Sequence, residues 1–256
     1  MTRTNRVLEV LSLFSEFKSN LSAQDIAQHM GIARATAYRC IHDLEARGLL
    51  ESSGNGEYVL GPTIVELDRR IRLADPLIRA AAPIMGPLSV QTGGMVLLCR
   101  VHGRKVLCVH ECPGAHGPLS VSYERGRAMP LYRGATSRAI LANLSAKELL
   151  TLAKIDPEGM VQAGLPEQPD ALLEWAAEQR QYKVWHSQGE VDPGAAGWAV
   201  ALHHGKQLLG SLSVVLSRDH IRGRGAAISD QVVRAGLRIE GRLEARNPTS
   251  DRTSPT

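Results

Sequence analysis

The sequence lacks any apolar run of about 18 residues, the length that a membrane-spanning helix needs. It also lacks the cleavage site of a secretory signal peptide, and its amphipathic start carries Glu9 and Glu16. Four cysteines in 256 residues are too few for a dense disulfide framework. These absences argue against a membrane partner and predict a protein of the reducing cytoplasm.

The common catalytic motifs are missing as well. The sequence contains no nucleophile elbow G-x-S-x-G, no Walker A loop and no H-E-x-x-H. The segment ATSRA lacks the lysine of an S-x-x-K pair, and no paired carboxylates lie at helical spacing near a candidate pocket. We therefore expect no enzymatic activity and no cofactor, with a small-molecule enzyme as the least favoured alternative.

The net charge of +4 and the isoelectric point near 9.0 suggest a nucleic-acid partner, but the charge is unevenly distributed. Residues 1–61 hold six Lys or Arg against seven Asp or Glu, whereas residues 62–256 hold 24 against 19. If the front of the chain binds DNA, it does so through a few well-placed arginines and not through bulk charge.

Three helices and a hairpin are predicted in the first 61 residues. The first helix covers Arg6–Phe17, where apolar residues recur at helical spacing. Ser22 and Asp25 mark the capped start of a second helix, which ends at Gly31. A third helix covers about residues 34–46, and the segment LLESSGNGEYVLG then indicates a hairpin.

Two helices joined by a glycine turn, the second beginning with small and basic residues, form the helix-turn-helix pattern. Arg34 and Arg39 can reach guanine edges or phosphates, and Thr36 can reach a phosphate or a thymine methyl. The predicted DNA contacts are Arg6, Arg34, Thr36, Ala37, Tyr38, Arg39, Asn55 and Gly56. The alternative, a solvated face of an ordinary three-helix unit, is disfavoured by the order of capped helix, glycine turn, helix, hairpin and linker.

The rest of the chain predicts an α+β fold around an antiparallel sheet. Strands are expected at MVLLCRV, KVLCVHE, LSVSYE, GWAVALHH and LLGSLSVVLS. Helices are expected at residues 76–93, 136–144, 145–154, 168–181 and 226–245. The predicted domains are a winged helix-turn-helix at 1–61, a linker helix at 62–75, an effector-binding and oligomerisation domain at 76–246, and a disordered tail at 247–256.

One cysteine- and histidine-rich stretch raises the question of a metal site. It contains Cys99, His102, Cys108, His110, Cys112 and His116. On a regular strand Cys108, His110 and Cys112 share one face, so three ligands could converge. The tight C-x-x-C spacings of structural sites are missing, and small buried cysteines with surface histidines explain the stretch equally well. No metal is therefore predicted.

Several segments carry a resemblance to a known family. In the front part they are NRVLEVLSLF, LSAQDIAQHMGIARATAYRCIHDLEARGLLE and YVLGPTIVELDRR. In the rear part they are GRAMPLYRGATSRAILANL, GEVDPGAAGWAVAL and LLGSLSVVLSR. Together they resemble the IclR family of bacterial transcription regulators over nearly the whole chain. The resemblance implies a winged helix-turn-helix, a linker helix and a GAF-like effector domain, in dimers or tetramers on operator DNA.

The start of the predicted third helix departs from the family pattern in one respect. The family commonly has a polar residue or a proline around positions 33 and 35, where this chain has Ala33 and Ala35. That removes a helix N-cap, which is typically worth about 1 kcal/mol. More of the polar contact with DNA is therefore expected from Arg34, Thr36 and Arg39.

The resemblance also implies an effector pocket at the start of the helix in GATSRAIL, where small carboxylates bind in related proteins. Backbone N–H groups and the helix dipole suit an anion there, although the same residues can serve as a simple helix cap. The implied effector-binding residues are Ala135, Thr136, Ser137, Ser187, Gly197, Ser213 and Val215. Family members that bind small, very polar acids have an acid, a cysteine and two serines at the positions of Ser187, Gly197, Ser213 and Val215, and this chain keeps only Ser213. The loss of polar groups and the open Gly197 favour a larger or more apolar acid such as an aromatic carboxylate.

The expected function follows from these two parts. We expect a sequence-specific transcriptional regulator that binds double-stranded operator DNA as a homodimer or a dimer of dimers, under the control of a small organic acid. RNA polymerase is a further candidate partner. The alternative is a DNA-binding architectural protein whose rear domain only oligomerises.

Overall fold

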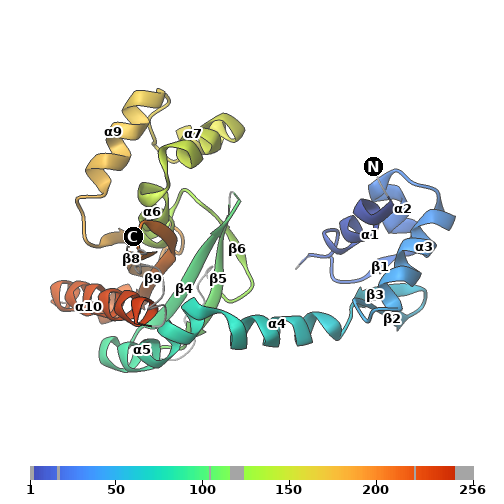
Figure 1. Cartoon of the computed structure of the whole chain (residues 1–256), viewed down its shortest axis with the longest axis horizontal. Helices are drawn as coiled ribbons and strands as arrows, with labels where there is room; N and C mark the ends of the chain where they lie inside the picture. Colours follow the sequence, from blue (N-terminus) through green and yellow to red (C-terminus); the bar gives the residue numbers. More distant parts are fainter. Residues whose placement is uncertain (1–2, 16–17, 104, 116–123, 222, 246–256) are drawn as a thin grey trace, which may run out of the picture. The chain divides into compact units, whose positions relative to one another are not determined.

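The computed structural model describes residues 3–15, 18–103, 105–115, 124–221 and 223–245 (Figure 1). The chain divides into two compact units, Met1–Ala74 and Asp75–Thr256. Among the described residues, no helix combines the length and the apolar composition that crossing a membrane requires.

The front unit is a helical unit with a small antiparallel sheet. Its elements are α1 (Arg3–Leu11), β1 (Leu21–Ser22), α2 (Ala23–Met30), α3 (Arg34–Glu45), β2 (Leu50–Gly54), β3 (Glu57–Leu60) and α4 (Thr63–Ala74). The first helix begins and ends earlier than predicted, and its predicted end at Phe17 lies outside the described residues. The two-residue strand β1, which pairs with β3, was not predicted.

The predicted signals around α2 are confirmed. The backbone N–H of Asp25 donates to the Ser22 hydroxyl over 3.1 Å, and the backbone N–H of Ser22 donates to Asp25 Oδ2 over 3.0 Å. This is a reciprocal capping box. At the other end Gly31 has φ = 62°, the left-handed conformation that favours glycine. The turn between α2 and α3 is therefore fixed by local chemistry.

The Ser22–Asp25 box makes the front unit sensitive to acid. Hydrogen bonds from Ser22 to the Asp25 carboxylate, supported by Lys18, lower its pKa to about 2. A lowered pKa gives stability that is complete above the unfolded pKa of about 4 and is lost as the pH falls toward 2. We expect Asp25→Asn to lower the melting temperature at pH 7, measured by circular dichroism. The difference in melting temperature between this variant and wild type should become smaller as the pH falls from 4 to 2. Glu51→Gln, a change at an exposed residue of β2, should do neither.

Helix α3 begins without a side-chain cap, as the sequence indicates, because Ala33 occupies the N-cap position in extended conformation. Its inner face buries Ala37, Cys40, Ile41 and Leu44 in the core of the front unit. The outer face is consequently left to the polar residues between them.

The rear unit contains one six-stranded sheet in the order β6-β5-β4-β9-β8-β7, and every neighbouring pair is antiparallel. Its strands are β4 (Met95–His102), β5 (Lys105–Cys112), β6 (Ala128–Pro130), β7 (Trp185–Gln188), β8 (Ala195–His204) and β9 (Gln207–Ser217). The antiparallel α+β prediction is confirmed. The short edge strands β6 and β7 were not predicted, and the predicted strand at 119–124 falls almost wholly outside the described residues.

Helices pack on both faces of this sheet (Figure 1). They are α5 (Pro76–Thr92), α6 (Gly134–Asn143), α7 (Ala146–Ile155), α8 (Pro157–Gln162), α9 (Pro169–Gln179), the short 3₁₀ helix η1 (Arg218–His220) and α10 (Gly225–Glu244). One core contains residues of α5 and α10, and a second contains residues of α6 to α9. The sheet thus separates two hydrophobic cores, and α8 was not predicted.

Asp75, the first residue of the rear unit, has two roles. Its carboxylate accepts hydrogen bonds from the backbone N–H groups of Leu77 (2.8 Å) and Ile78 (3.3 Å), which caps α5. The same Oδ1 atom pairs with Arg100 of β4 at 2.8 Å. The start of the rear unit is therefore connected directly to a central strand of its sheet.

Strand β9 approaches β4 closely at Gly210, which has φ = 153°. A Cβ atom at this position would overlap the backbone carbonyl oxygen of Cys99. Glycine is required here because both the conformation and the close approach exclude a side chain.

Candidate DNA-binding surface and effector pocket

The outer face of α3 presents two pairs of polar side chains. Arg34 Nη2 donates to the Tyr38 hydroxyl at 3.3 Å, and its guanidinium lies 5.6 Å from the centre of the tyrosine ring. In the second pair, Arg39 Nη2 donates to Thr36 Oγ1, three residues earlier in the helix, at 3.2 Å. Arg34, Tyr38 and Arg39 are exposed. The face therefore offers two fixed guanidinium groups, the type of donor that binds phosphate oxygens and guanine edges.

The remaining predicted DNA contacts have different surroundings. Asn55, with φ = 54°, and Gly56 are exposed at the tip of the β2–β3 hairpin, and Arg6 is half-buried on α1. The prediction for Ala37 is wrong, because its side chain is 0% exposed in the core of the front unit. Ala37 lies on the inner face of α3 with Cys40, Ile41 and Leu44, where DNA cannot reach it.

The start of α6 brings together residues from two strands of the rear sheet. The backbone N–H of Ala135 donates to Ser187 Oγ of β7 at 2.9 Å. Thr136 Oγ1 donates to Ser213 Oγ of β9 at 3.0 Å. The helix has Arg133 at its N-cap position and begins at Gly134 with φ = 82°. The predicted residues of the helix and of the strands thus lie side by side.

Strand register explains why the strand residues meet there. Ser187 pairs with Gly197, and Gly197 pairs with Val215, so the three residues form one row across β7, β8 and β9. They line a pocket of about 30 Å³ together with Ala135 and Thr136. That volume is far below the roughly 300–1,000 Å³ of pockets that hold a small organic ligand. Such a ligand can enter only if the lining moves.

Ser137 and Ser213, the other two predicted effector contacts, are both fully buried. Neither is among the residues that line this pocket. Ser213 still touches the pocket indirectly, because it accepts the hydrogen bond from Thr136. The structure therefore brings five of the seven predicted residues to the pocket surface.

Comparison with known proteins agrees with this arrangement. Residues 4–54 match the IclR helix-turn-helix domain, and residues 74–240 match the bacterial transcriptional regulator IclR C-terminal domain. The chain belongs to the IclR family. Since both halves of the family architecture are present, it is an IclR-type DNA-binding transcriptional regulator.

Several relatives match this IclR-family chain over nearly its whole length. The HTH-type transcriptional regulator KipR of Bacillus subtilis is 25% identical over 239 residues, which are 92% of this chain and 94% of KipR. A putative transcriptional regulator from Rhodococcus sp. RHA1 has a TM-score of 0.77 at 18% identity, with coverage of 96% and 100%. An IclR homolog from Microbacterium hydrocarbonoxydans, described as complexed with 4-hydroxybenzoate, has a TM-score of 0.74 at 20% identity, with coverage of 95% and 100%.

The cysteine-rich stretch of this IclR-family chain is not arranged as the strand pattern suggested. Strand β5 contains a register shift, because Leu98 pairs with His110 whereas its neighbour Cys99 pairs with Cys108. Cys108 consequently lies in the core under α6, while Cys112 packs against the core of α5 and α10. The expected shared face of Cys108, His110 and Cys112 is therefore wrong.

The thiol chemistry also disfavours metal binding. The hydrogen bond with Cys108 and burial raise the pKa of Cys99, and burial raises that of Cys112. Metals bind the thiolate, and a raised pKa keeps the thiol protonated. Within the described part of the chain, no three His, Cys, Asp or Glu side chains are grouped to hold a metal ion, and His116 lies outside that part.

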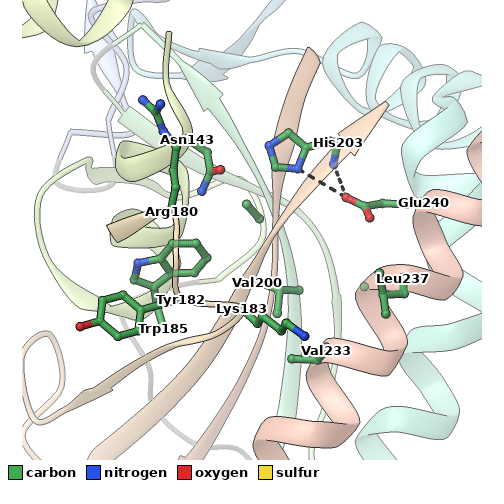
Figure 2. Close-up of a pocket in the computed structure, with 12 residues that line it drawn as sticks. Asn143, Arg180, Tyr182, Lys183, Trp185, Val200, His203, Val233, Leu237 and Glu240 are labelled. Carbon is green, nitrogen blue, oxygen red and sulfur yellow. Dashed lines mark hydrogen bonds and ion pairs between the residues drawn. The ribbon is translucent and has the colours of Figure 1, made fainter. Parts of the chain in front are cut away.

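A second hollow lies at the edge of the sheet, where β8 extends beyond the start of β7. Its volume is about 340 Å³. Figure 2 shows Trp185 and Tyr182 on one side of it and the His203–Glu240 pair on the other. Arg180 and Lys183 add two cationic groups to the lining. We call this the sheet-edge hollow, and it is a rival location for an acidic ligand in this regulator.

Sequence reasoning missed Glu190 and Arg138. Glu190 Oε2 accepts a hydrogen bond from the backbone N–H of Gly134 at 3.2 Å and pairs with Arg138 Nη2 at 3.3 Å. Glu190 lies 56 residues from Gly134 along the chain. No local pattern indicates such a contact, since it depends on the packing of the β7–β8 loop against α6.

Proposed function

We propose that this IclR-type regulator binds operator DNA as a homodimer or a dimer of dimers, and that a small organic acid at the start of α6 controls this binding. The observation that carries the proposal is the convergence of the first turn of α6 with Ser187, Gly197 and Val215. The proposed domains remain 1–61, 62–75 and 76–246, followed by a tail. Bacterial operator DNA lies in the cytoplasm, so the protein is proposed to act there.

For the DNA contact, we propose that α3 enters the major groove. Arg34 and Arg39 would contact bases or phosphates, Thr36 and Tyr38 would contact the backbone, and the hairpin tip at Asn55 and Gly56 would approach the adjacent backbone. Exposure of the two arginines and their fixed orientation support this assignment. Arg6 is a further candidate for a phosphate contact.

The apolar surface of α4 supports self-association. This helix buries none of its described residues, and its exposed apolar side chains are Val65, Leu67, Ile71 and Leu73. Leu67 and Ile71, four residues apart, lie on one face of the helix, and exposed apolar residues that share a face are typical of a protein–protein contact. A symmetric dimer would present two copies of α3 to half-sites about one helical turn apart.

For the effector, we propose an aromatic monocarboxylate. The pocket lining is mostly small and apolar, with Ala135, Gly197 and Val215 leaving room for a ring once the lining moves. The structural neighbour described with 4-hydroxybenzoate makes that acid the first probe. Calorimetry that shows tight binding of glyoxylate or pyruvate, but none of benzoate-like acids, would contradict this class.

We propose a regulatory function without catalysis. The relatives are named transcriptional regulators, which supports this assignment. An architectural protein would bind DNA identically with and without small acids. Turnover of a bound acid would instead indicate an enzyme.

Filling the pocket at Gly197 tests the proposed site. A Cβ at Gly197 would lie 3.5 Å from Ser187 Oγ and 3.8 Å from Ala135 Cβ, which is ordinary contact, so the sheet should tolerate a side chain. We expect Gly197→Val to reduce affinity for 4-hydroxybenzoate by about tenfold or more, because each lost 1.4 kcal/mol is tenfold. Calorimetry measures the affinity for the acid. Fluorescence anisotropy with an operator selected from random duplexes should show that the affinity for DNA is unchanged.

Gly197→Ala is the matched control and should lower the affinity for the acid less than Gly197→Val does. If Gly197→Val binds the acid as wild type does, the acid occupies another place. A lower affinity for the acid in Lys183→Met would then place the acid in the sheet-edge hollow.

A further inference from the structure

The carboxylate of Glu190 lies at the point where an acid would meet the start of α6. Its Oε2 atom accepts from the N–H of Gly134, the first residue of the helix, and pairs with Arg138 one turn later. A helix N-terminus and a guanidinium are together a favourable position for an anion. The chain places its own anion there.

The next backbone N–H of the helix, that of Ala135, donates its hydrogen bond to the hydroxyl of Ser187. Two backbone N–H groups at the start of α6 are therefore satisfied by residues of the chain itself. The carboxylate of an added ligand would need the same donors. Two carboxylates close together repel each other, so an acid and Glu190 compete for this position.

The small volume of the pocket has the same origin. Glu190 and Val191 belong to the β7–β8 loop and form part of the lining that leaves about 30 Å³. The ends of the loop are anchored, since Gly189 N–H donates to the carbonyl of Ala195 at 2.8 Å and Arg218 N–H donates to that of Gly194 at 2.9 Å. Withdrawal of Glu190 thus requires a change confined to a short segment between two glycines.

We propose that Glu190 sets the affinity and selectivity of the effector site by acting as an internal competitor for the anion position. The proposal rests on the proposed function, since it concerns the same site. An acid binds by displacing the carboxylate from Gly134 and Arg138. A small hydrophilic acid gains little beyond what Glu190 already supplies, whereas an acid with an apolar body also gains from burial of that body. The competition therefore selects acids with an apolar or aromatic body.

Removing the internal carboxylate tests the inference in the full-length protein. Glu190→Ala should lower the melting temperature, and sodium acetate should restore it more than sodium chloride of equal ionic strength does. The same variant should bind 4-hydroxybenzoate about tenfold tighter than wild type, which corresponds to about 1.4 kcal/mol. Glu190→Gln keeps an acceptor for Gly134 but loses the charge, so its affinity should lie between the two.

Glu178→Ala, at an exposed residue of α9, is the matched control and should behave as wild type in both measurements. Equal effects of acetate and chloride on Glu190→Ala would overturn the inference. So would unchanged or weaker binding of 4-hydroxybenzoate by both Glu190 variants when wild type binds it. If neither wild type nor a variant binds 4-hydroxybenzoate while acetate restores Glu190→Ala, Glu190 holds the anion position, but its selection of aromatic acids and the proposed aromatic effector are both wrong. If Glu190→Ala does not fold, Glu190→Gln decides through its affinity.

Discussion

Replacing Gly210 with alanine is expected to destabilise the rear unit by about 4 kcal/mol or more, at the upper end of what single substitutions cause. The new Cβ would overlap the carbonyl oxygen of Cys99 on the neighbouring strand. Both partners in this overlap are backbone or fixed to it, so rotation of a side chain cannot relieve it. The φ of 153° adds strain, because L-residues rarely adopt it. Strands β4 and β9 must therefore separate at the centre of the sheet.

Thermal or urea unfolding followed by circular dichroism measures this effect. Gly241→Ala is a matched control, since Gly241 lies exposed in α10 and its added Cβ would meet no atom within 4 Å. Alanine is expected to stabilise that helix by about 0.5–1 kcal/mol. A Gly210→Ala protein that unfolds as wild type does would show that β4 and β9 are not as close as described.

The second large effect is expected at Arg39. Losing a bidentate contact to a base costs about 1–3 kcal/mol, and a dimer loses it twice. Arg39→Ala should therefore weaken operator binding by about 100-fold or more, while affinity for 4-hydroxybenzoate stays unchanged. The side chain lies on the outer face of α3, and among the described residues it bonds only to its own helix, so the fold should persist.

Fluorescence anisotropy with the selected operator and with single-base variants identifies what Arg39 contacts. Loss of discrimination at one base position indicates a base contact, whereas uniform weakening and a smaller salt dependence indicate a phosphate contact. Arg234→Ala, at an exposed residue of α10, removes the same charge from the rear unit and serves as the control. Unchanged operator affinity in Arg39→Ala would contradict a reading role for this arginine.

Much of the front unit could be predicted because its signals are local. Ser22 and Asp25 are three residues apart, and Gly31 ends the helix that they begin. The α+β class of the rear unit could also be predicted from its alternating strands. Strands β6 and β7 could not, because three or four residues are too few to show a period.

Contacts across the rear sheet depend on register, which sequence periodicity does not give. The register shift in β5 moves Cys112 to the face opposite Cys108, although a regular strand would keep them together. The contact between Glu190 and Gly134 joins residues 56 positions apart. The family resemblance directed attention to the start of α6, but the carboxylate of Glu190 at that place became visible only in the folded arrangement.

The double role of Asp75 has a mechanical consequence. A residue at the boundary of a unit can move independently of that unit when its side chain has no partner. Here the junction residue is held by the first turn of α5 and by Arg100 of β4, and β4 pairs with β9, the strand that carries Ser213. A displacement of the sheet therefore moves Asp75 as part of the same rigid piece. The first residue of the rear unit is therefore fixed to the sheet of that unit.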